Sequence, residues 1–382
     1  MDIADLRVAL FSGNYNYVRD GANQALNRLV DYLLRQGAAV RIYAPVVDPA
    51  AFPPTGDLVG IPAVPIPMRS EYRFPLGLSR ANRDDLARFA PDVLHVSSPD
   101  VTAHAALKWG EQRGLPVLAS VHTRFETYPR YYGFAFAEPW VVGLMQRFYQ
   151  RCDALVAPSE SMAEVLRAQG MNRDIGIWSR GVDRTVFDPA RRDLAWRRSL
   201  GFGDDEVAIG FLGRLVMEKG LDVFGETVAA LRARQVPHKV LVVGEGPARE
   251  WFAERVPEAV FTGIQTGPEL GRAVASMDLL LNPSVTETFG NVTLEAMASG
   301  VPVIAARATG STSLVADGET GYLVEPGRVL DFADVIAGYV ADPGKRRAHG
   351  AAGEIRSRAY SWDAINRSVA DKYVALVAAR RR

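Results

Sequence analysis

A glycine-rich run with two cations stands near the middle of the sequence. Residues 210–220 read Gly-Phe-Leu-Gly-Arg-Leu-Val-Met-Glu-Lys-Gly, between a strand pattern and a helical pattern. Gly213 would let the backbone approach a ligand, while Arg214 and Lys219 place positive charge at the carboxyl end of the strand. Open α/β sheets bind ligands at that edge, and a guanidinium binds phosphate oxygens well. The run predicts a diphosphate site, with a solvated surface turn as the alternative.

Two glutamates flank a second glycine-containing segment. Seven residues separate Glu287 from Glu295. If a helix begins at Gly290 and Asn291, Glu287 lies in the preceding loop and Glu295 lies inside the helix, so both can face one ligand. The amides of Phe289, Gly290 and Asn291 would then form an anion or hydroxyl site. We expect Glu295 to accept hydrogen bonds from ribose hydroxyls. The alternative is an acid at a helix start plus one solvated glutamate.

One histidine follows a strand pattern in the first half of the chain. His122 comes directly after the run 117–121, which places it at a carboxyl strand end facing a cleft. A lone histidine is more often structural than functional, and that alternative stays open here. His95, His104, His238 and His349 lack a comparable context. We interpret those four as structural.

The loop after the first strand pattern contains Asp20 and Gly21. Gly21 permits close approach of a ligand to the backbone. Asp20 is either the cap of a helix that starts at Asn23 or a base on the acceptor side of a reaction, and the cap is favoured.

Two segments of the first half mix arginines with aromatic residues, 68–74 and 124–134. Arginines attract anionic headgroups, and aromatic rings settle at a membrane interface. The alternative is a packing surface between domains. The predicted acceptor or membrane contacts are Arg69, Arg73, Arg124, Tyr128, Arg130, Tyr131 and Tyr132.

Short apolar runs separated by helical patterns must position these residues. They span 7–11, 39–43, 93–96, 117–121 and 154–157, and the theme restarts at 207–212, 239–243, 260–262, 279–282 and 301–305. Uniformly apolar runs are typical of parallel strands buried on both faces. We therefore expect an α/β protein with two doubly wound domains, residues 1–188 and 189–360. Residues 361–382 form a terminal helix that packs on the first domain.

Composition excludes several classes of protein. The 382 residues include 44 basic and 44 acidic side chains, so no overall field attracts nucleic acid. The single Cys152 excludes an intramolecular disulfide framework and a cysteine-based zinc cluster. The first residues do not read as a signal peptide, and no apolar run approaches the roughly 20 residues that span a bilayer. We expect a cytoplasmic protein, with any membrane association peripheral and on the inner face.

These motifs together resemble family 4 retaining glycosyltransferases of the GT-B architecture, two Rossmann-like domains around a cleft. The matching stretches are 213–220, 244–247, 287–295 and 318–321, with 158–159 and 181–183 in the first half. Where members of that family usually carry a Gly-Gly pair after the first strand, this chain has Asp20 and Gly21.

The resemblance implies a role for each matching residue. Arg214 and Lys219 would bind the donor pyrophosphate without a metal ion, and Glu287 would hold the donor sugar. Glu295 would bind the ribose, and His122 would lie near the donor sugar. The loop containing Gly244 and Gly246 would border the base, together with Thr262.

The sequence from His122 through residue 133, together with residues 178–183, is similar to that of the family branch that glycosylates lipids. This branch includes bacterial mannosyltransferases and sulfoquinovosyl-diacylglycerol synthases. The nucleotide-diphosphate sugar is then a substrate, and no cofactor or obligate protein partner is expected. GDP-mannose is favoured as donor over a UDP-sugar, and a lipid or glycolipid as acceptor. The alternatives are a soluble or polysaccharide-precursor acceptor, a nucleotide-sugar epimerase, or a nucleotide-sugar-binding protein without transfer activity.

Overall fold

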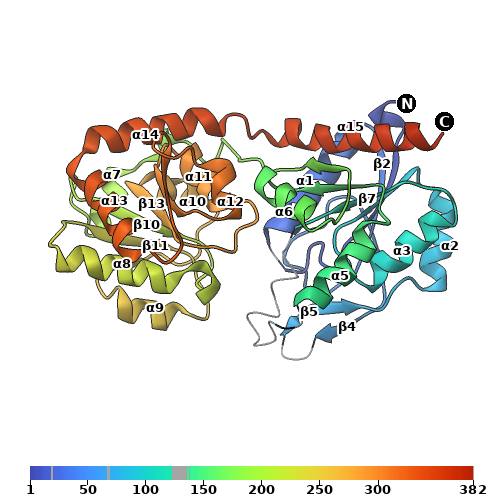
Figure 1. Cartoon of the computed structure of the whole chain (residues 1–382), viewed down its shortest axis with the longest axis horizontal. Helices are drawn as coiled ribbons and strands as arrows, with labels where there is room; N and C mark the ends of the chain where they lie inside the picture. The colour runs from blue at the N-terminus through green and yellow to red at the C-terminus, as the bar shows by residue number, and fades with distance from the viewer. Residues whose placement is uncertain (19, 67–68, 123–135, 137, 382) are drawn as a thin grey trace. The chain divides into compact units, whose positions relative to one another are not determined.

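The computed structural model describes the chain except residues 19, 67–68, 123–135, 137 and 382, and it describes residues 69–71 by their backbone alone (Figure 1). The chain divides into two compact units. The first comprises Met1–Arg180 together with Trp362–Arg382, and the second comprises Gly181–Ser361. The sequence predicts the boundary between the two domains after residue 188, whereas the structure has it after Arg180.

The first unit is built on a parallel sheet. Within the described residues it has seven strands in the order β3-β2-β1-β6-β7-β8-β9, so that β1 lies between β2 and β6. An antiparallel hairpin, β4 with β5, stands apart from it. The strands are β1 (Arg7–Phe11), β2 (Ala39–Ala44), β3 (Asp57–Gly60), β4 (Ala63–Ile66), β5 (Arg69–Pro75), β6 (Val93–Val96), β7 (Val117–Ser120), β8 (Ala154–Ala157) and β9 (Ile175–Ile177).

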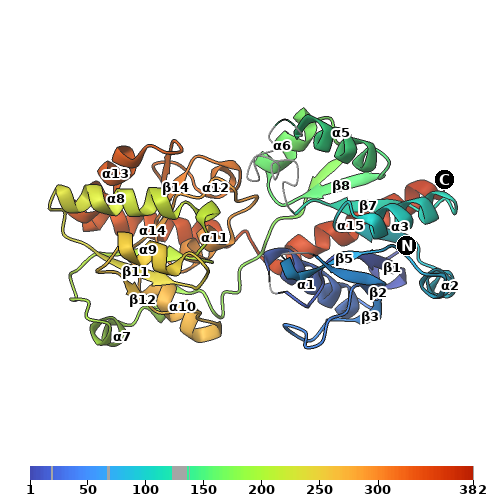
Figure 2. The ribbon, with the colours of Figure 1, turned by 90° about the horizontal axis from the view of Figure 1, so that it is seen from below.

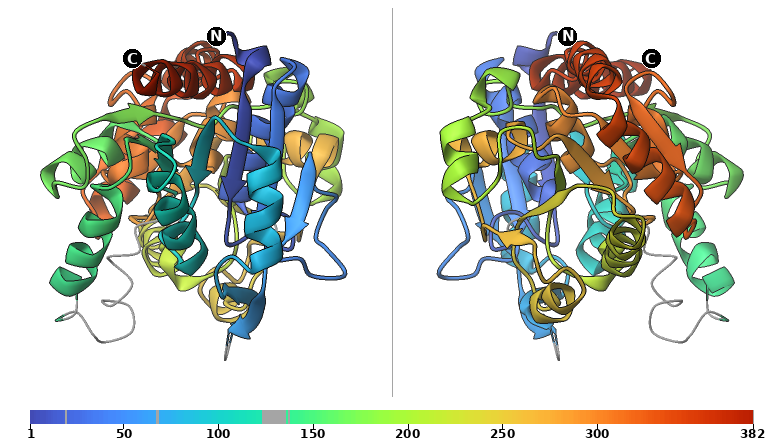
Figure 3. Two further views of the ribbon diagram at one scale, coloured as in Figure 1. Left: turned by 90° about the vertical axis from the view of Figure 1, so that its right-hand side faces the viewer. Right: turned by 90° about the vertical axis from the view of Figure 1, so that its left-hand side faces the viewer.

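Helices cover both faces of this sheet. The helical segments are η1 (Ile3–Asp5), α1 (Gly21–Arg35), α2 (Arg80–Phe89), α3 (Val101–Glu111), α5 (Glu138–Tyr149), α6 (Glu160–Ala168) and α15 (Trp362–Arg380). Leu94 and Val96 of β6 pack in one core with side chains of α2, α3, α5 and α6. The C-terminal α15 contacts α1 and β6 (Figure 2). It also contacts η1, so both ends of the chain lie side by side (Figure 3).

The second unit repeats the theme with six parallel strands in the order β12-β11-β10-β13-β14-β15. The strands are β10 (Ala208–Leu212), β11 (Lys239–Val243), β12 (Val260–Phe261), β13 (Leu279–Asn282), β14 (Val303–Ala306) and β15 (Gly321–Val324). The helical segments are η4 (Pro189–Arg191), α7 (Leu194–Ser199), η5 (Met217–Lys219), α8 (Leu221–Ala233), α9 (Arg249–Arg255), α10 (Gly267–Ala275), α11 (Asn291–Ala298), α12 (Thr309–Leu314), α13 (Val329–Ala341) and α14 (Pro343–Ser357).

The two α/β sheets confirm the fold class expected from the sequence. All ten predicted apolar runs overlap a parallel strand. The sequence missed β3, β9, β15 and the β4–β5 hairpin. The missed strand β3 has two exposed and two half-buried residues, so it lacks the uniformly apolar pattern of a strand buried on both faces.

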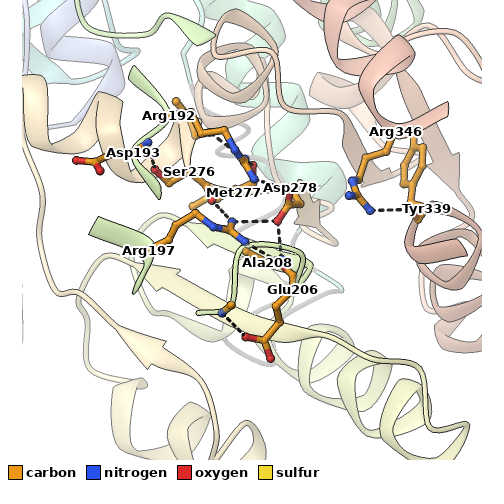
Figure 4. A network of polar contacts seen from close by, with 12 residues as sticks. Arg192, Asp193, Arg197, Glu206, Ala208, Ser276, Met277, Asp278, Tyr339 and Arg346 are labelled. Atoms are coloured by element: carbon orange, nitrogen blue, oxygen red, sulfur yellow. Dashed lines mark hydrogen bonds and ion pairs between the residues drawn. The ribbon is translucent and has the colours of Figure 1, made fainter. Parts of the chain in front are cut away.

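A buried ion cluster fastens the start of the second unit to its sheet (Figure 4). The Asp278 carboxylate, at the start of β13, accepts hydrogen bonds from Arg197 at 3.0 Å and from Arg192 at 2.8 Å. The same carboxylate accepts one from the backbone N–H of Ala208 at the start of β10, at 2.8 Å. Arg197 is only 1% exposed and also donates to the carbonyl oxygen of Ser276 at 2.6 Å. One carboxylate therefore joins the segment before the sheet to two central strands.

We expect Asp278→Ala to lower the free energy of unfolding of the protein by about 3–5 kcal/mol, because Arg197 would be left buried without its counter-charge. Urea denaturation measures this change. The control is Asp334→Ala, whose exposed ion pair with Arg234 should contribute below about 1 kcal/mol. Equal losses in the two variants would contradict the assigned role of Asp278.

Candidate active site

The centre of the second sheet presents its carboxyl edge at the point where the strand order reverses. Strand β10 pairs with β11 on one side and with β13 on the other. Ligands of open α/β sheets bind outside the carboxyl ends of strands at such a point. The loops after β10 and β13 are the ones that carry the predicted cations and acids. The fold therefore brings the two sequence motifs to one edge.

Glycines allow the loops after β10 and β11 to touch. Gly244 has a φ of +137°, and a Cβ there would stand 1.9 Å from the carbonyl oxygen of Gly213. A Cβ on Gly246 would stand 2.3 Å from the carbonyl oxygen of Leu215. Gly213 has a φ of +141° and no heavy atom within 4 Å of its Cβ position. The backbone contact thus needs glycine at 244 and 246, and space remains beside Gly213.

The predicted cation and acid meet directly. Lys219, the last residue of η5, donates from Nζ to Oε1 of Glu287 at 2.5 Å. The Glu287 side chain is 16% exposed and that of Lys219 is 31% exposed, so water screens the pair only partly. Between the same two loops, the Thr286 hydroxyl donates to the carbonyl oxygen of Glu218 at 3.1 Å. The ion pair and this hydrogen bond therefore hold the loop after β10 against the loop after β13.

The second acid lies beside the first. Helix α11 begins at Asn291 after Gly290, as the sequence predicts, and no side chain caps that end. Glu295 lies within this helix. Burial, together with the negative charge of Glu287, raises the pKa of Glu295 to about 7. Two carboxyl groups that influence each other, next to Lys219, form a site for a polar ligand with several hydroxyl groups.

Arg214 and Thr262 stand at the border of this site. Arg214 is exposed, and within the chain that the structure describes its guanidinium has no hydrogen-bond or ion-pair partner. Thr262 follows β12 and donates its hydroxyl to the carbonyl oxygen of Val242 at 3.2 Å. The next residue, Gly263, accepts a hydrogen bond from the N–H of Gly244. Arg214 is thus available for an anion, while Thr262 supports the loop after β11.

In the first unit, His122 follows β7 and both its ring nitrogens are hydrogen-bonded. Nδ1 lies 2.8 Å from Nη2 of Arg180, and Nε2 lies 2.9 Å from Oγ of Ser120. Burial lowers the pKa of His122 well below its ordinary value, and the positive charge of Arg180 lowers it further. The imidazole is neutral at pH 7 and has a fixed orientation.

Asp20 is a helix cap in this structure. Its carboxylate accepts from the backbone N–H groups of Ala22 at 2.9 Å and Asn23 at 2.8 Å, and from the Asn14 side chain at 3.0 Å. The sequence analysis also favours a helix cap over a base on the acceptor side. The helix starts at Gly21 instead of Asn23, because the cap residue itself is Asp20.

Most of the predicted acceptor or membrane contacts lie outside the described residues: Arg124, Tyr128, Arg130, Tyr131 and Tyr132. The backbone of Arg69 belongs to β5. Arg73, also in β5, is half-buried, and its backbone N–H donates to the hydroxyl of Tyr17 at 3.3 Å. Further along the chain, Trp140 is 69% exposed and Leu144 is 42% exposed, one helical turn apart on α5. These two side chains form an apolar surface that the sequence analysis did not include.

Neither a membrane-spanning helix nor a metal-binding cluster occurs among the described residues. None of their helices has the length and apolarity needed to cross a bilayer. Nowhere among them do three or more His, Cys, Asp or Glu side chains gather in a way that could hold a metal ion. Cys152 is buried, and burial raises the pKa of its thiol to about 12.

Comparison with known proteins identifies the family. A family model described as "Glycosyltransferase Family 4" matches residues 19–186, and one described as "Glycosyl transferases group 1" matches residues 206–342. A GDP-mannose-dependent alpha-mannosyltransferase of Mycolicibacterium smegmatis is 33% identical over 98% of this chain and 99% of its own length. The chain belongs to glycosyltransferase family 4. It is a glycosyltransferase of the GT-B fold.

Other relatives of this family 4 glycosyltransferase are more distant. Sulfoquinovosyl transferase SQD2 of Arabidopsis thaliana is 31% identical over 82% of this chain, which spans 62% of that protein. Sucrose-phosphate synthase of Thermosynechococcus elongatus is 22% identical with a TM-score of 0.80, covering 97% of this chain and 99% of that one. The solved structure shares the fold.

Sequence reasoning missed four polar residues around His122 in this glycosyltransferase. They are Arg180, which bonds the ring, and Ser120, His95 and Tyr373, which continue from it. The sequence analysis interprets His95 as structural because this histidine lacks a context like that of His122. A signal was present, because His95 and Ser120 are polar residues within otherwise apolar strand patterns, and buried polar groups require partners.

Glu295 should give the glycosyltransferase a measurable dependence of stability on pH. Its pKa is about 7 in the folded protein against an ordinary 4.5, so the folded state holds the proton more tightly than the unfolded chain. The free energy of unfolding therefore falls as pH rises between these two values. Glu295→Gln lacks this titration, so its stability relative to wild type should improve between about pH 5 and about pH 8. Urea denaturation at both pH values measures the difference, and a constant difference would contradict the assignment.

Proposed function

We propose that this glycosyltransferase moves a hexose from a nucleotide-diphosphate sugar to a hydroxyl group of a lipid or glycolipid, with retention of configuration and without a metal ion. The observation that carries the proposal is the contact between Lys219 and Glu287, next to Glu295, at the carboxyl edge of the second sheet. A cation and two acids at that edge match the needs of a sugar linked to a diphosphate.

Donor binding would rearrange the ion pair. A pyrophosphate carries more negative charge than a carboxylate, so Lys219 would turn towards it, joined by the exposed Arg214. Glu287 would then be released to accept hydrogen bonds from sugar hydroxyls. Glu295 would accept those of the ribose, and the loop at Gly244 and Gly246 would border the base.

The chemistry follows from where the charge develops. The bond between the sugar C1 and the leaving phosphate oxygen breaks, and a new bond forms between C1 and the acceptor oxygen on the same face of the ring. The proton of the acceptor hydroxyl passes to the leaving phosphate. Arg214 and Lys219 stabilise the charge on that phosphate, which is an interaction that strengthens in the transition state. The role of His122 in this proposal comes from the family resemblance, which implies that this histidine lies near the donor sugar.

GDP-mannose is the proposed donor, with a UDP-sugar as the second candidate. The support is the printed name of relatives, including the M. smegmatis protein and a GDP-mannose-dependent alpha-mannosyltransferase of Corynebacterium glutamicum, which is 29% identical over the whole of this chain.

A lipid acceptor at the inner face of the cytoplasmic membrane is proposed because two neighbouring stretches of the chain have side chains that suit a membrane surface. Trp140 and Leu144 expose apolar surface on α5, close in sequence to the arginine- and aromatic-rich segment 124–134. Rings and arginines of this kind suit a membrane interface. One relative favours a soluble acceptor instead: a D-inositol 3-phosphate glycosyltransferase of Stackebrandtia nassauensis is 33% identical over 89% of this chain.

Incubation with radiolabelled GDP-mannose or UDP-glucose, each with and without lipid extract, tests donor and acceptor together. Label in the lipid phase supports the proposal. Label in a water-soluble product with added inositol phosphate supports the soluble acceptor, a changed free nucleotide sugar indicates an epimerase, and no product with any donor indicates a binding protein. Undiminished transfer in EDTA is expected, and an EDTA-induced loss restored by Mg²⁺ would refute metal independence.

Lys219→Ala should weaken binding of GDP or UDP by about tenfold or more, because a charge-assisted contact to phosphate is lost. Isothermal titration calorimetry measures the affinity. Lys239→Ala is the matched control, since Lys239 starts β11 at the opposite edge of the same sheet and donates to the carbonyl oxygen of Gly201. Unchanged affinity in Lys219→Ala would remove Lys219 from the phosphate site.

Glu287→Gln should lower kcat by at least about a hundredfold, because the neutral amide cannot replace the carboxylate that holds the donor sugar. Its melting temperature should stay within a few degrees of that of wild type, because the amide oxygen can still accept the hydrogen bond from Lys219. Glu226→Gln on the exposed face of α8 is the control. Transfer at the wild-type rate in Glu287→Gln would show that Glu287 does not act on the donor.

A further inference from the structure

A continuous chain of hydrogen bonds links Arg180, the last residue of the segment Met1–Arg180, to the C-terminal helix α15. Arg180 bonds Nδ1 of His122 at 2.8 Å, and Nε2 of His122 lies 2.9 Å from the Ser120 hydroxyl. The same hydroxyl lies 2.8 Å from Nε2 of His95, and Nδ1 of His95 bonds the hydroxyl of Tyr373 on α15. All five residues belong to one compact unit.

Strand alternation explains how these residues meet. Successive side chains of a strand point to opposite faces of the sheet. Leu94 and Val96 face the core under α2, α3, α5 and α6, so His95 between them faces the other side. Ser120, two residues after Leu118 on the neighbouring strand, points the same way, since Leu118 is the register partner of His95. Helix α15 packs on that face and places Tyr373 against His95.

The donors and acceptors can be arranged in one direction from Arg180. A guanidinium only donates, so Nδ1 of His122 must be the acceptor, and the neutral ring carries its proton on Nε2. That N–H donates to the Ser120 oxygen, whose own proton then points at Nε2 of His95. His95 in turn carries its proton on Nδ1 and donates it to the oxygen of Tyr373. Each hydrogen bond sets the protonation of the next ring.

Burial prevents water from replacing these bonds. His95 and Tyr373 are fully buried and Ser120 is 1% exposed. Burial lowers the pKa of His95 to about 3, so both rings are neutral at pH 7. Arg180 is also buried, and burial, partly offset by the negative charge of Asp20, lowers its pKa to about 10. Arg180 therefore remains the charged donor that orders the chain.

We propose that Ser120, His95 and Tyr373 are positioning residues for His122. Arg180 sets the Nε2–H tautomer of the ring, and the other three residues hold that N–H, and with it the ring, in one orientation through a relay ending on the C-terminal helix. The inference rests on the proposed function in so far as His122 serves the donor sugar. With both ring nitrogens bonded to protein groups, His122 does not take the acceptor proton. The terminal helix, far from His122 in sequence, thus helps to orient this ring.

Tyr373→Phe tests the relay, since it removes one hydroxyl and keeps the ring that packs against His95. We expect kcat to fall about tenfold, the effect of losing one buried hydrogen bond. In NMR spectra of protein labelled with ¹⁵N-histidine, the Nε2 shift of His122 should move, because the Ser120 oxygen that accepts from its N–H is no longer held by the relay. Ser120→Ala should give the same two results.

The second unit supplies a matched control. Tyr339 on α13 bonds Nδ1 of His349 at 2.7 Å in another buried pair, so Tyr339→Phe removes the same kind of hydrogen bond. It should leave kcat and the His122 shifts unchanged. The double variant Tyr373→Phe/Ser120→Ala should be no slower than Ser120→Ala alone, because a relay broken once loses nothing more when broken again.

Unaltered His122 shifts in Ser120→Ala and Tyr373→Phe would overturn the proposal, and so would an equal loss of kcat in Tyr339→Phe. If Tyr373→Phe fails to fold, Ser120→Ala decides the question, since it removes a single oxygen atom. The NMR experiment needs no substrate. A wrong donor or acceptor would thus leave its result intact, which separates failure of the relay from failure of the proposed function.

Discussion

The ion pair between Lys219 and Glu287 is the contact on which the site in the second unit depends. It joins the loop after β10 to the loop after β13, and both loops leave the sheet where its strand order reverses. The pair is only partly exposed, so each charge needs a partner at all times. A ligand that supplies an anion to Lys219 and hydroxyl groups to Glu287 can replace the pair without leaving either charge buried alone. The architecture thus favours a ligand that carries both functions in one molecule.

Much of the fold and of this site could be predicted from the sequence because the signals are local. An apolar run of four or five residues marks a strand buried on both faces, and the strand's end fixes where the next loop begins. Lys219 and Glu287 each follow such a run, so a parallel sheet brings them to one edge although 68 positions separate them. Gly290 likewise marks the start of α11 within its own motif.

The relay behind His122 could not be predicted in the same way, because its meaning depends on a distant partner. His95 and Tyr373 are 278 positions apart and meet only because α15 returns to the first unit after the second has been completed. The sequence shows Tyr373 as one apolar position in a helical pattern. The Tyr373 hydroxyl meets the imidazole of His95 because of how α15 packs on the sheet. No local sequence pattern indicates this contact. Reading His95 as structural was therefore the natural inference from sequence.

Asp20 stands where the family resemblance implies a glycine, and its charge explains this difference. A buried guanidinium is costly without a nearby negative charge. Arg180 receives this charge from Asp20, whose carboxylate is held in place by the first turn of α1. Burial raises the pKa of Asp20 above its ordinary value, and the helix N–H groups, Asn14 and Arg180 only partly oppose this shift. A glycine at position 20 would remove both the cap and the counter-charge. The departure from the family pattern and the ordered ring of His122 are thus parts of one electrostatic arrangement, linked through Arg180.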